Sequence, residues 1–240
     1  MGDLESLRSN LDAVRERVAR AAERAGRRAQ DVLLIGVSKT VTAERIRLGV
    51  EAGLTALGEN RVQEAREKIK ILGRPVPWHL IGPLQTNKVR GALELFDLIH
   101  SLDRLELARE IDKRAGDPGR VVDTLLEVNV AGEPAKSGFA PDALGAALEA
   151  IGGMTHLRVR GLMTIPPMVE RAEDSRRWFQ TLRGLAEGHG LKELSMGMSA
   201  DFEVAIEEGA TMVRVGTAIF GERPARPARA TSPARQKGDA

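Results

Sequence analysis

The stretch Val32-Leu33-Leu34-Ile35-Gly36-Val37-Ser38-Lys39 indicates how this chain folds. Its first six residues are apolar or glycine, with no alternation of polar and apolar positions. Such a run is typical of a strand that is buried on both faces in a parallel sheet. Lys39 ends the run, and in parallel α/β folds the carboxyl ends of the strands form the functional face. Lys39 is therefore the first candidate for a functional side chain.

The chemistry expected of Lys39 depends on how much water surrounds its amine. Burial favours the neutral form of an amine, and a neutral amine can condense with a carbonyl group. The plainer interpretation is a strand-end lysine whose stem is buried and whose ammonium is solvated or ion-paired, which is common. This segment alone favours the plainer interpretation, so the rest of the chain has to decide between the two.

Strand-like runs and helical patterns alternate along the whole chain. Eight strands are predicted, at 32–39, 56–59, 78–82, 98–102, 123–130, 159–165, 193–198 and 212–216. Helices are predicted at 4–26, 43–52, 61–71, 85–95, 104–114, 140–151, 173–187 and 201–208. In 240 residues this pattern predicts an α/β fold, a single (β/α)8 TIM barrel with an extra N-terminal helix. The alternative is a doubly wound open sheet, which usually has a glycine-rich turn after its first strand, and residues 38–42 contain no glycine.

The charge distribution separates a barrel domain, 1–221, from a tail, 222–240. The net charge is +2, and the tail alone carries five basic and two acidic residues. It is rich in proline, alanine and arginine and offers no apolar residue that could anchor it to a core. We therefore expect the tail to be disordered and basic.

The composition excludes several classes of function. Cysteine is absent, which excludes disulfides, thiolate metal sites and a cysteine nucleophile, and fits a cytoplasmic protein. No cluster of histidines and carboxylates is apparent, so no metal is expected. Aromatic residues make up 3% of the chain, too few for a nucleic-acid platform. No run approaches the length of a membrane span or of the apolar core of a signal peptide.

In a barrel, the residues that follow the strands meet at one opening, the mouth. The residues expected there are Lys39, Asn60, Arg61, Pro83, Gln85, Asn129, Met163, Thr164, Ser199, Gly216 and Thr217. They include no pair of carboxylates at equivalent positions, so glycosidase chemistry is not expected. Ser199, Gly216 and Thr217 follow the last two strands, where barrels commonly bind phosphate through backbone N–H groups and hydroxyls. The plainer interpretation of Ser199 is an ordinary helix N-cap.

A lysine that captures a carbonyl and a phosphate site at one mouth suggest two kinds of protein. One is a Schiff-base aldolase acting on a sugar phosphate, and the other binds pyridoxal 5′-phosphate (PLP), which carries both an aldehyde and a phosphate. Arg214 lies two residues before Gly216, so both point to the same side of the strand. An arginine beside a pyridine nitrogen would keep that nitrogen unprotonated and the ring a poor electron sink. A salt bridge inside the barrel is an equally good interpretation of Arg214.

Six ordered motifs resemble those of one known family, the PLP homeostasis proteins, also called YggS or proline synthase co-transcribed proteins. The motifs are GVSKT (36–40), GENRVQE (58–64), WHLIGPLQTNK (78–88), GLMT (161–164), SMGMSADF (195–202) and RVGTAIFG (214–221). The resemblance runs from about residue 4 to residue 221. Pro83 departs from it, since many members carry another residue there, often histidine. The tail is not part of the shared pattern.

The resemblance implies a barrel similar to the N-terminal domain of alanine racemase, a fold-type III PLP-binding barrel. By this match Lys39 would hold PLP as a Schiff base, and Ser199, Gly216 and Thr217 would hold its phosphate. Arg214 would face the pyridine nitrogen, with Asn60 and Met163 lining the ring. His79 would support the pocket from behind. The family is thought to carry, buffer or deliver PLP without robust catalysis, which implies apo-enzymes as partners; a monomer is expected.

The absence of tyrosine bears on catalysis. Alanine racemase uses two bases, a lysine and a tyrosine from its partner's second domain, and this chain has neither a tyrosine nor the length for a second domain after residue 221. No catalytic residue is therefore assigned. A PLP-dependent racemase or lyase of narrow specificity is the alternative to a carrier, and a cofactor-free aldolase is the third possibility.

Overall fold

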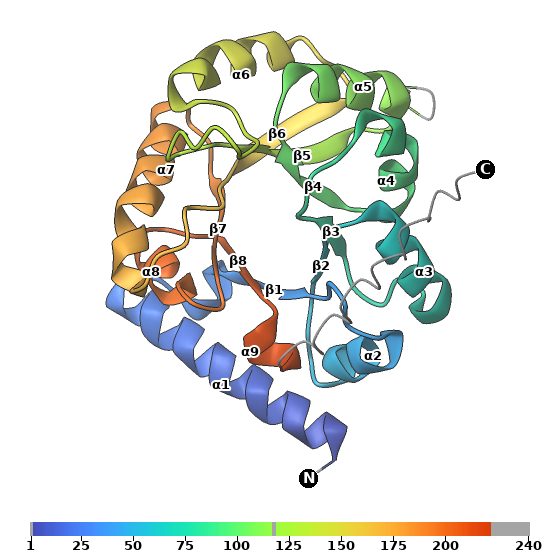
Figure 1. Ribbon diagram of the computed structural model, residues 1–240, viewed down its shortest axis with the longest axis vertical. Coiled ribbons are helices and arrows are strands. Elements are labelled where there is room, and N and C mark those ends of the chain that lie inside the picture. Colours follow the sequence, from blue (N-terminus) through green and yellow to red (C-terminus); the bar gives the residue numbers. More distant parts are fainter. Residues whose placement is uncertain (1, 117–118, 222–240) are drawn as a thin grey trace, which may run out of the picture.

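Eight parallel strands close into a barrel in the order in which they occur along the chain (Figure 1). The structure is a computed structural model that describes residues 2–116 and 119–221. The strands are β1 (Leu33–Val37), β2 (Leu57–Glu59), β3 (Trp78–Leu80), β4 (Leu98–Leu102), β5 (Val122–Glu127), β6 (Leu157–Met163), β7 (Glu193–Met198) and β8 (Met212–Val215). Strand β1 pairs with both β2 and β8, which closes the barrel. The barrel prediction is confirmed, and the open-sheet alternative is wrong.

Helices follow the strands and lie outside the barrel (Figure 1). They are α1 (Asp3–Arg24), α2 (Ala43–Glu51), α3 (Val62–Leu72), α4 (Val89–Leu95), α5 (Leu105–Gly116), α6 (Leu144–Gly152), α7 (Arg176–Gly188), α8 (Phe202–Glu207) and α9 (Thr217–Phe220). Short 3-10 turns precede β1, α4, α6 and α7, at Ala29–Asp31, Thr86–Lys88, Pro141–Ala143 and Ala172–Ser175. Helix α9 was not predicted, because four residues are too few to show a helical period.

The N-terminal helix α1 is an added layer on one side of the barrel. Leu7, Leu11, Val14 and Val18 recur at helical spacing and are buried. They pack against α2, α8 and α9, next to the point where β1 and β8 close the barrel. Burying four such side chains stabilises the fold by roughly 1.5–3 kcal/mol each, so α1 reinforces the closure.

Two apolar clusters make up the core. The larger lies between the strands and the helices. The smaller consists of Ile35, Ala56, Leu98, Leu125, Met163 and Met212, which alternate along their strands with outward-facing residues. Polar side chains are buried as well, among them His79, His100, Ser195 and Arg214, and these lead to the functional site.

The predicted tail, 222–240, falls outside the described residues. None of the described helices combines the length and the hydrophobicity that a membrane span requires.

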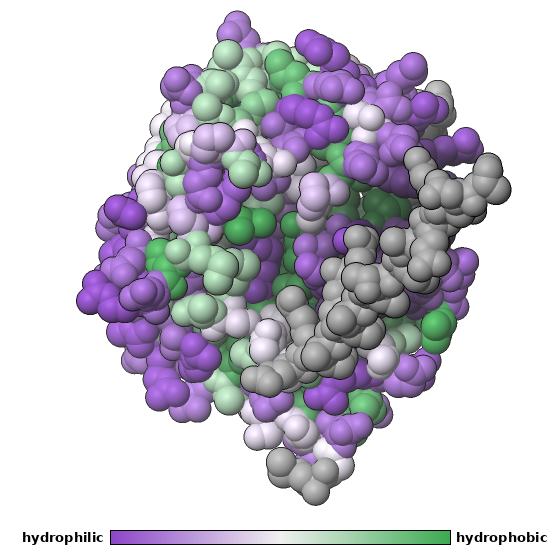
Figure 2. Space-filling model, viewed as in Figure 1, coloured by the Kyte–Doolittle hydropathy of each residue, from purple (hydrophilic) through white to green (hydrophobic). Residues whose placement is uncertain are grey.

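Figure 2 shows the face seen in Figure 1: its rim is mostly polar, and apolar side chains gather toward its centre where grey atoms do not cover it.

Candidate functional site

Lys39 lies in the turn that follows β1 and lines a cavity of about 540 Å³ at the mouth. The cavity is also lined by residues after β2 and β3, namely Asn60, Arg61, Val62, Gln63, Pro83, Leu84, Gln85 and Lys88. The side chain is half-buried, and within the described part of the chain its amine has neither a hydrogen bond nor an ion pair. The described residues therefore give Lys39 no ion-pair partner, and the interpretation of a buried stem with a solvated ammonium stays open beside that of a ligand-binding amine.

The ends of β2 and β3 approach each other closely at Asn60. A Cβ atom on Gly82 would lie 2.6 Å from the carbonyl oxygen of Asn60 and 2.8 Å from its Cα, a separation that no side chain tolerates. The backbone N–H of Asn60 donates to Glu59 Oε2 at 2.9 Å. Glycine at position 82 and this hydrogen bond together fix Asn60 on the wall of the cavity that Lys39 lines.

The structure brings two of the three predicted phosphate-site residues into contact. The backbone N–H of Gly216 donates to Ser199 Oγ at 3.3 Å, which joins the loops after β7 and β8. A Cβ atom on Gly216 would lie 3.3 Å from Val37 Cβ, so this junction also lies against the end of β1, two residues before Lys39. Thr217 is exposed and begins α9, where the first N–H groups have no acceptor within the helix.

Ser199 is not an N-cap, contrary to the plainer interpretation. Helix α8 begins at Phe202 and its N-cap is Asp201, whose carboxylate accepts from the N–H of Met198 at 2.8 Å and from Ser175 Oγ at 3.1 Å. The hydroxyl of Ser199 is thus not used to start α8. The helix that starts beside Ser199 and Gly216 is α9, whose N-cap is Gly216.

Arg214 points into the barrel and is held by neutral groups. It is 3% exposed, and its guanidinium donates to Ser195 Oγ at 2.6 Å and to the carbonyl oxygen of Thr164 at 2.9 Å. Among the described residues it has no ion pair, so the predicted alternative of a salt bridge inside the barrel is wrong. Burial lowers the pKa of Arg214 to about 10, and the charges of Glu127 and Asp201 oppose that shift.

A buried chain of hydrogen bonds runs from Arg214 across the barrel. A guanidinium only donates, so the Ser195 hydroxyl accepts from Arg214. The same hydroxyl is hydrogen-bonded to His100 Nδ1 at 2.8 Å, and His100 Nε2 is hydrogen-bonded to His79 Nδ1 at 2.9 Å. Burial lowers the pKa of His79 to about 4 and that of His100 well below its usual value, so both rings are neutral. His79 is therefore a core histidine, as predicted.

Two other predicted mouth residues, Met163 and Asn129, contact parts of the fold and not the cavity that Lys39 lines. Met163 is fully buried in the inner apolar cluster at the end of β6, below the mouth. Asn129 binds the backbone of its own loop: its Nδ2 donates to the carbonyl oxygen of Glu133 at 2.9 Å, and its Oδ1 accepts from the N–H of Glu133 at 3.2 Å. Asn129 therefore shapes the loop after β5.

Glu127, at the end of β5, is a mouth residue that the sequence analysis missed. It lines a cavity of about 300 Å³ that shares Pro83 with the cavity of Lys39. Burial and the charge of Asp103 raise the pKa of Glu127 to about 7, and Arg214 opposes the rise. The predicted strand ran on to residue 130, which placed Glu127 inside it. A strand ending at residue 127 would have brought this carboxyl to the mouth.

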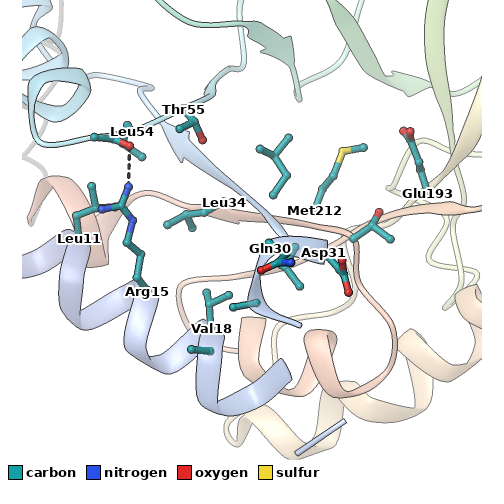
Figure 3. Close-up of a pocket in the computed structure, with 16 residues that line it drawn as sticks. Leu11, Arg15, Val18, Gln30, Asp31, Leu34, Leu54, Thr55, Glu193 and Met212 are labelled. Atoms are coloured by element: carbon teal, nitrogen blue, oxygen red, sulfur yellow. Dashed lines mark hydrogen bonds between the residues drawn. The ribbon is translucent and has the colours of Figure 1, made fainter. Parts of the chain in front are cut away.

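A larger cavity, about 750 Å³, lies at the opposite end of the barrel (Figure 3). It opens between α1 and the amino ends of β1 and β8, and Arg15 in it donates to the carbonyl oxygen of Gly53 at 2.7 Å. Its two carboxylates are already paired, Asp31 with Arg28 and Glu193 with Arg160. The amino end of such barrels serves stability, so this cavity is not the functional site.

Comparisons with known proteins agree with this geometry. Residues 9–224 match the family model "Alanine racemase, N-terminal domain". The pyridoxal phosphate homeostasis protein of Aquifex aeolicus is 50% identical over 220 residues, 89% of this chain and 96% of that protein. PipY of Synechococcus elongatus PCC7942, solved with PLP bound, is 37% identical, with a TM-score of 0.77 over 90% of this chain and 100% of that chain.

Alanine racemase of Clostridium difficile 630 shares the fold, with 16% identity and a TM-score of 0.69. The match covers 92% of this chain but 56% of the racemase. The resemblance drawn from the six motifs is confirmed by these comparisons. A closed eight-stranded barrel with a lysine at the end of β1, together with 50% identity across nearly the full length of a member, shows that this chain belongs to the pyridoxal phosphate homeostasis protein family.

Proposed function

We propose that this protein binds PLP at the mouth of its barrel, as a Schiff base on Lys39, and carries or buffers the cofactor for PLP homeostasis in the cytoplasm. Two observations support the proposal: the amine of Lys39 lines the mouth without a partner among the described residues, and the junction of Ser199 with Gly216 lies against Val37, at the end of the same strand. PLP supplies an aldehyde that an amine captures reversibly with release of water, and its phosphate suits N–H and hydroxyl donors.

The chain's own residues fit the parts of this cofactor. Ser199 and Thr217 offer hydroxyls and the start of α9 offers N–H groups for the phosphate, next to the strand that bears Lys39. The N–H of Gly216, which donates to Ser199 Oγ in the structure, would turn to the phosphate when PLP binds. Asn60 lines the same cavity as Lys39 and would flank the ring. Met163 lies beneath the mouth as an apolar support for the ring. Arg214 would face the pyridine nitrogen, and the hydrogen-bond chain behind it fixes its direction.

We propose that the bound cofactor undergoes no efficient turnover. An arginine opposite the pyridine nitrogen leaves the ring neutral, which weakens its ability to stabilise a carbanion. The chain contains no tyrosine that could act as a second base in the manner of alanine racemase. The cofactor would then be retained and released, with PLP-dependent apo-enzymes as its recipients and a monomer as the carrying unit.

One observation favours the alternative, a PLP-dependent racemase or lyase. The pKa of Glu127 lies near 7 and its side chain faces the mouth, as a general acid or base would require. Amino-acid turnover that is lost in Glu127→Gln while PLP remains bound would establish this alternative.

The absorption spectrum of the protein mixed with PLP tests the proposal. Bound cofactor gives a visible band that a carbonyl-trapping amine removes; a protein that forms no such band would support the aldolase instead. Lys39→Ala should abolish the band. Lys88→Ala is the matched control, because Lys88 lines the same cavity, and it should retain the band. A band that persists in Lys39→Ala would contradict the proposal.

A further inference from the structure

The turn that carries Lys39 has an unusual backbone. The N–H of Val41 donates to the carbonyl oxygen of Ser38 at 2.9 Å, which closes a four-residue turn with Lys39 and Thr40 at its centre. Thr40 has a φ of 65°, the one positive φ outside glycine in the described residues. Position three of such a turn normally takes glycine or asparagine, and a β-branched residue there is strained. Something must therefore hold Thr40 in this conformation.

Three charged side chains beneath the turn provide that restraint. They are Glu59 at the end of β2 and Glu64 and Lys68 on α3, which together form what we call the Lys68 cluster. The ammonium of Lys68 donates to Glu59 Oε1, to Glu64 Oε1 at 2.7 Å and to the carbonyl oxygen of Ser38 at 2.6 Å. All three of its donors are used, and its side chain is only 9% exposed.

The cluster holds the turn on both sides of Lys39. On the near side, Ser38 donates its hydroxyl to Glu59 Oε1 at 3.0 Å and accepts from Lys68 through its carbonyl oxygen. On the far side, the N–H of Thr40 donates to Glu64 Oε1 at 2.7 Å. A relaxed Thr40, with negative φ, would turn the peptide between Lys39 and Thr40 over and point that N–H away from Glu64.

We propose that the Lys68 cluster is a positioning device for Lys39, which fixes the strained turn so that the Lys39 amine enters the mouth. This inference rests on the proposed function of Lys39 as the site of PLP attachment. Lys68 is itself a positioning residue and not a second attachment site, because its donors are saturated and it is buried. The hydrogen bonds of the cluster offset the conformational free energy of holding Thr40 at positive φ. Without the cluster, Thr40 would relax to negative φ and the turn would change conformation.

The test is a double-mutant cycle between Lys68→Met and Thr40→Gly. For each variant two quantities are measured: the dissociation constant for PLP, and the amount of PLP that borohydride traps on Lys39. In the natural background Lys68→Met should weaken PLP binding about tenfold, the value expected when a strained backbone is released. In the Thr40→Gly background the same change should cost less than about twofold, because glycine adopts positive φ without strain. Lys70→Met, on the exposed side of the same helix, is the matched control.

Amide exchange in the protein without PLP gives a second readout. Loss of the cluster should accelerate exchange of the Thr40 amide about tenfold, and the Lys70 control should leave it unchanged. If Lys68→Met does not fold, Glu64→Ala removes the acceptor of Thr40 N–H at a half-exposed position and should act in the same direction.

The outcomes separate the two proposals. An equal loss of affinity from Lys68→Met in both backgrounds, or no loss in either, overturns the positioning role while Lys39 remains the attachment site. Retention of the PLP adduct in Lys39→Ala overturns the proposed function and the positioning role with it. Faster exchange at Thr40 together with a loss of affinity that Thr40→Gly cancels supports both.

Discussion

Replacing Glu127 by glutamine should change how stability depends on pH. In the folded protein burial raises the pKa of this carboxyl from 4.5 to about 7. The folded state then binds the proton more tightly than the unfolded chain, so this group favours folding below pH 4.5, and that contribution is lost as the pH rises through 7. The shift corresponds to about 3 kcal/mol, or about 2 kcal/mol after allowing for the carboxyl's partial exposure. Glutamine cannot ionise, so the variant does not lose this part of its free energy of unfolding as the pH rises.

Urea unfolding of the variant and the natural protein at pH 5 and pH 8 measures the effect. The difference in free energy of unfolding, variant minus natural, should be larger at pH 8 by about 2 kcal/mol. Other carboxyls titrate in both proteins and cancel in this difference. Glu187→Gln, at a position whose side chain is 72% exposed, is the control and should show no such change. A difference in free energy of unfolding for Glu127→Gln that is the same at both pH values, within about 0.5 kcal/mol, would show that the pKa of Glu127 is not raised in the folded protein.

Two further substitutions test the walls of the mouth. Gly82→Ala places a Cβ atom 2.6 Å from the carbonyl oxygen of Asn60, and should lower the free energy of unfolding by about 1–3 kcal/mol and weaken PLP binding. Gly184→Ala, where nothing lies within 4 Å, should do neither; thermal melts and PLP titration distinguish them. Arg214→Met removes a buried charge but also two hydrogen bonds, so the protein without PLP should keep its stability within about 1 kcal/mol while PLP binding weakens. A large loss of stability with unchanged affinity would show that Arg214 serves the fold.

The barrel could be predicted from sequence because its strands are apolar runs bounded by helical patterns. Strand ends were less predictable. The runs at 78–82 and 123–130 continue as apolar sequence beyond β3 and β5, but the backbone leaves the sheet at Leu80 and Glu127 to form the mouth. Local hydrophobicity does not show where a hydrogen-bond ladder stops. Because the end of β5 could not be predicted, Glu127 was placed inside a strand and not at the mouth.

The position of a functional residue was predictable where it follows from a single strand, as for Lys39 at the end of β1. The hydrogen-bond chain behind Arg214 joins residues on β3, β4, β7 and β8, and no sequence spacing shows that these side chains meet. Lys68 follows Glu64 by four residues, which is the spacing of an ordinary surface pair on a helix. Only the folded chain shows that β2 and the turn after β1 cover this pair.

The proposed function depends most directly on Lys39 being the residue to which PLP attaches. Reducing the PLP-loaded protein with borohydride makes the attachment permanent, and mass spectrometry of its peptides then locates it. We expect one phosphopyridoxyl group per chain, on the peptide that contains Lys39. A group found instead on another lysine, such as Lys88 or Lys136, with Lys39 unmodified, would contradict it.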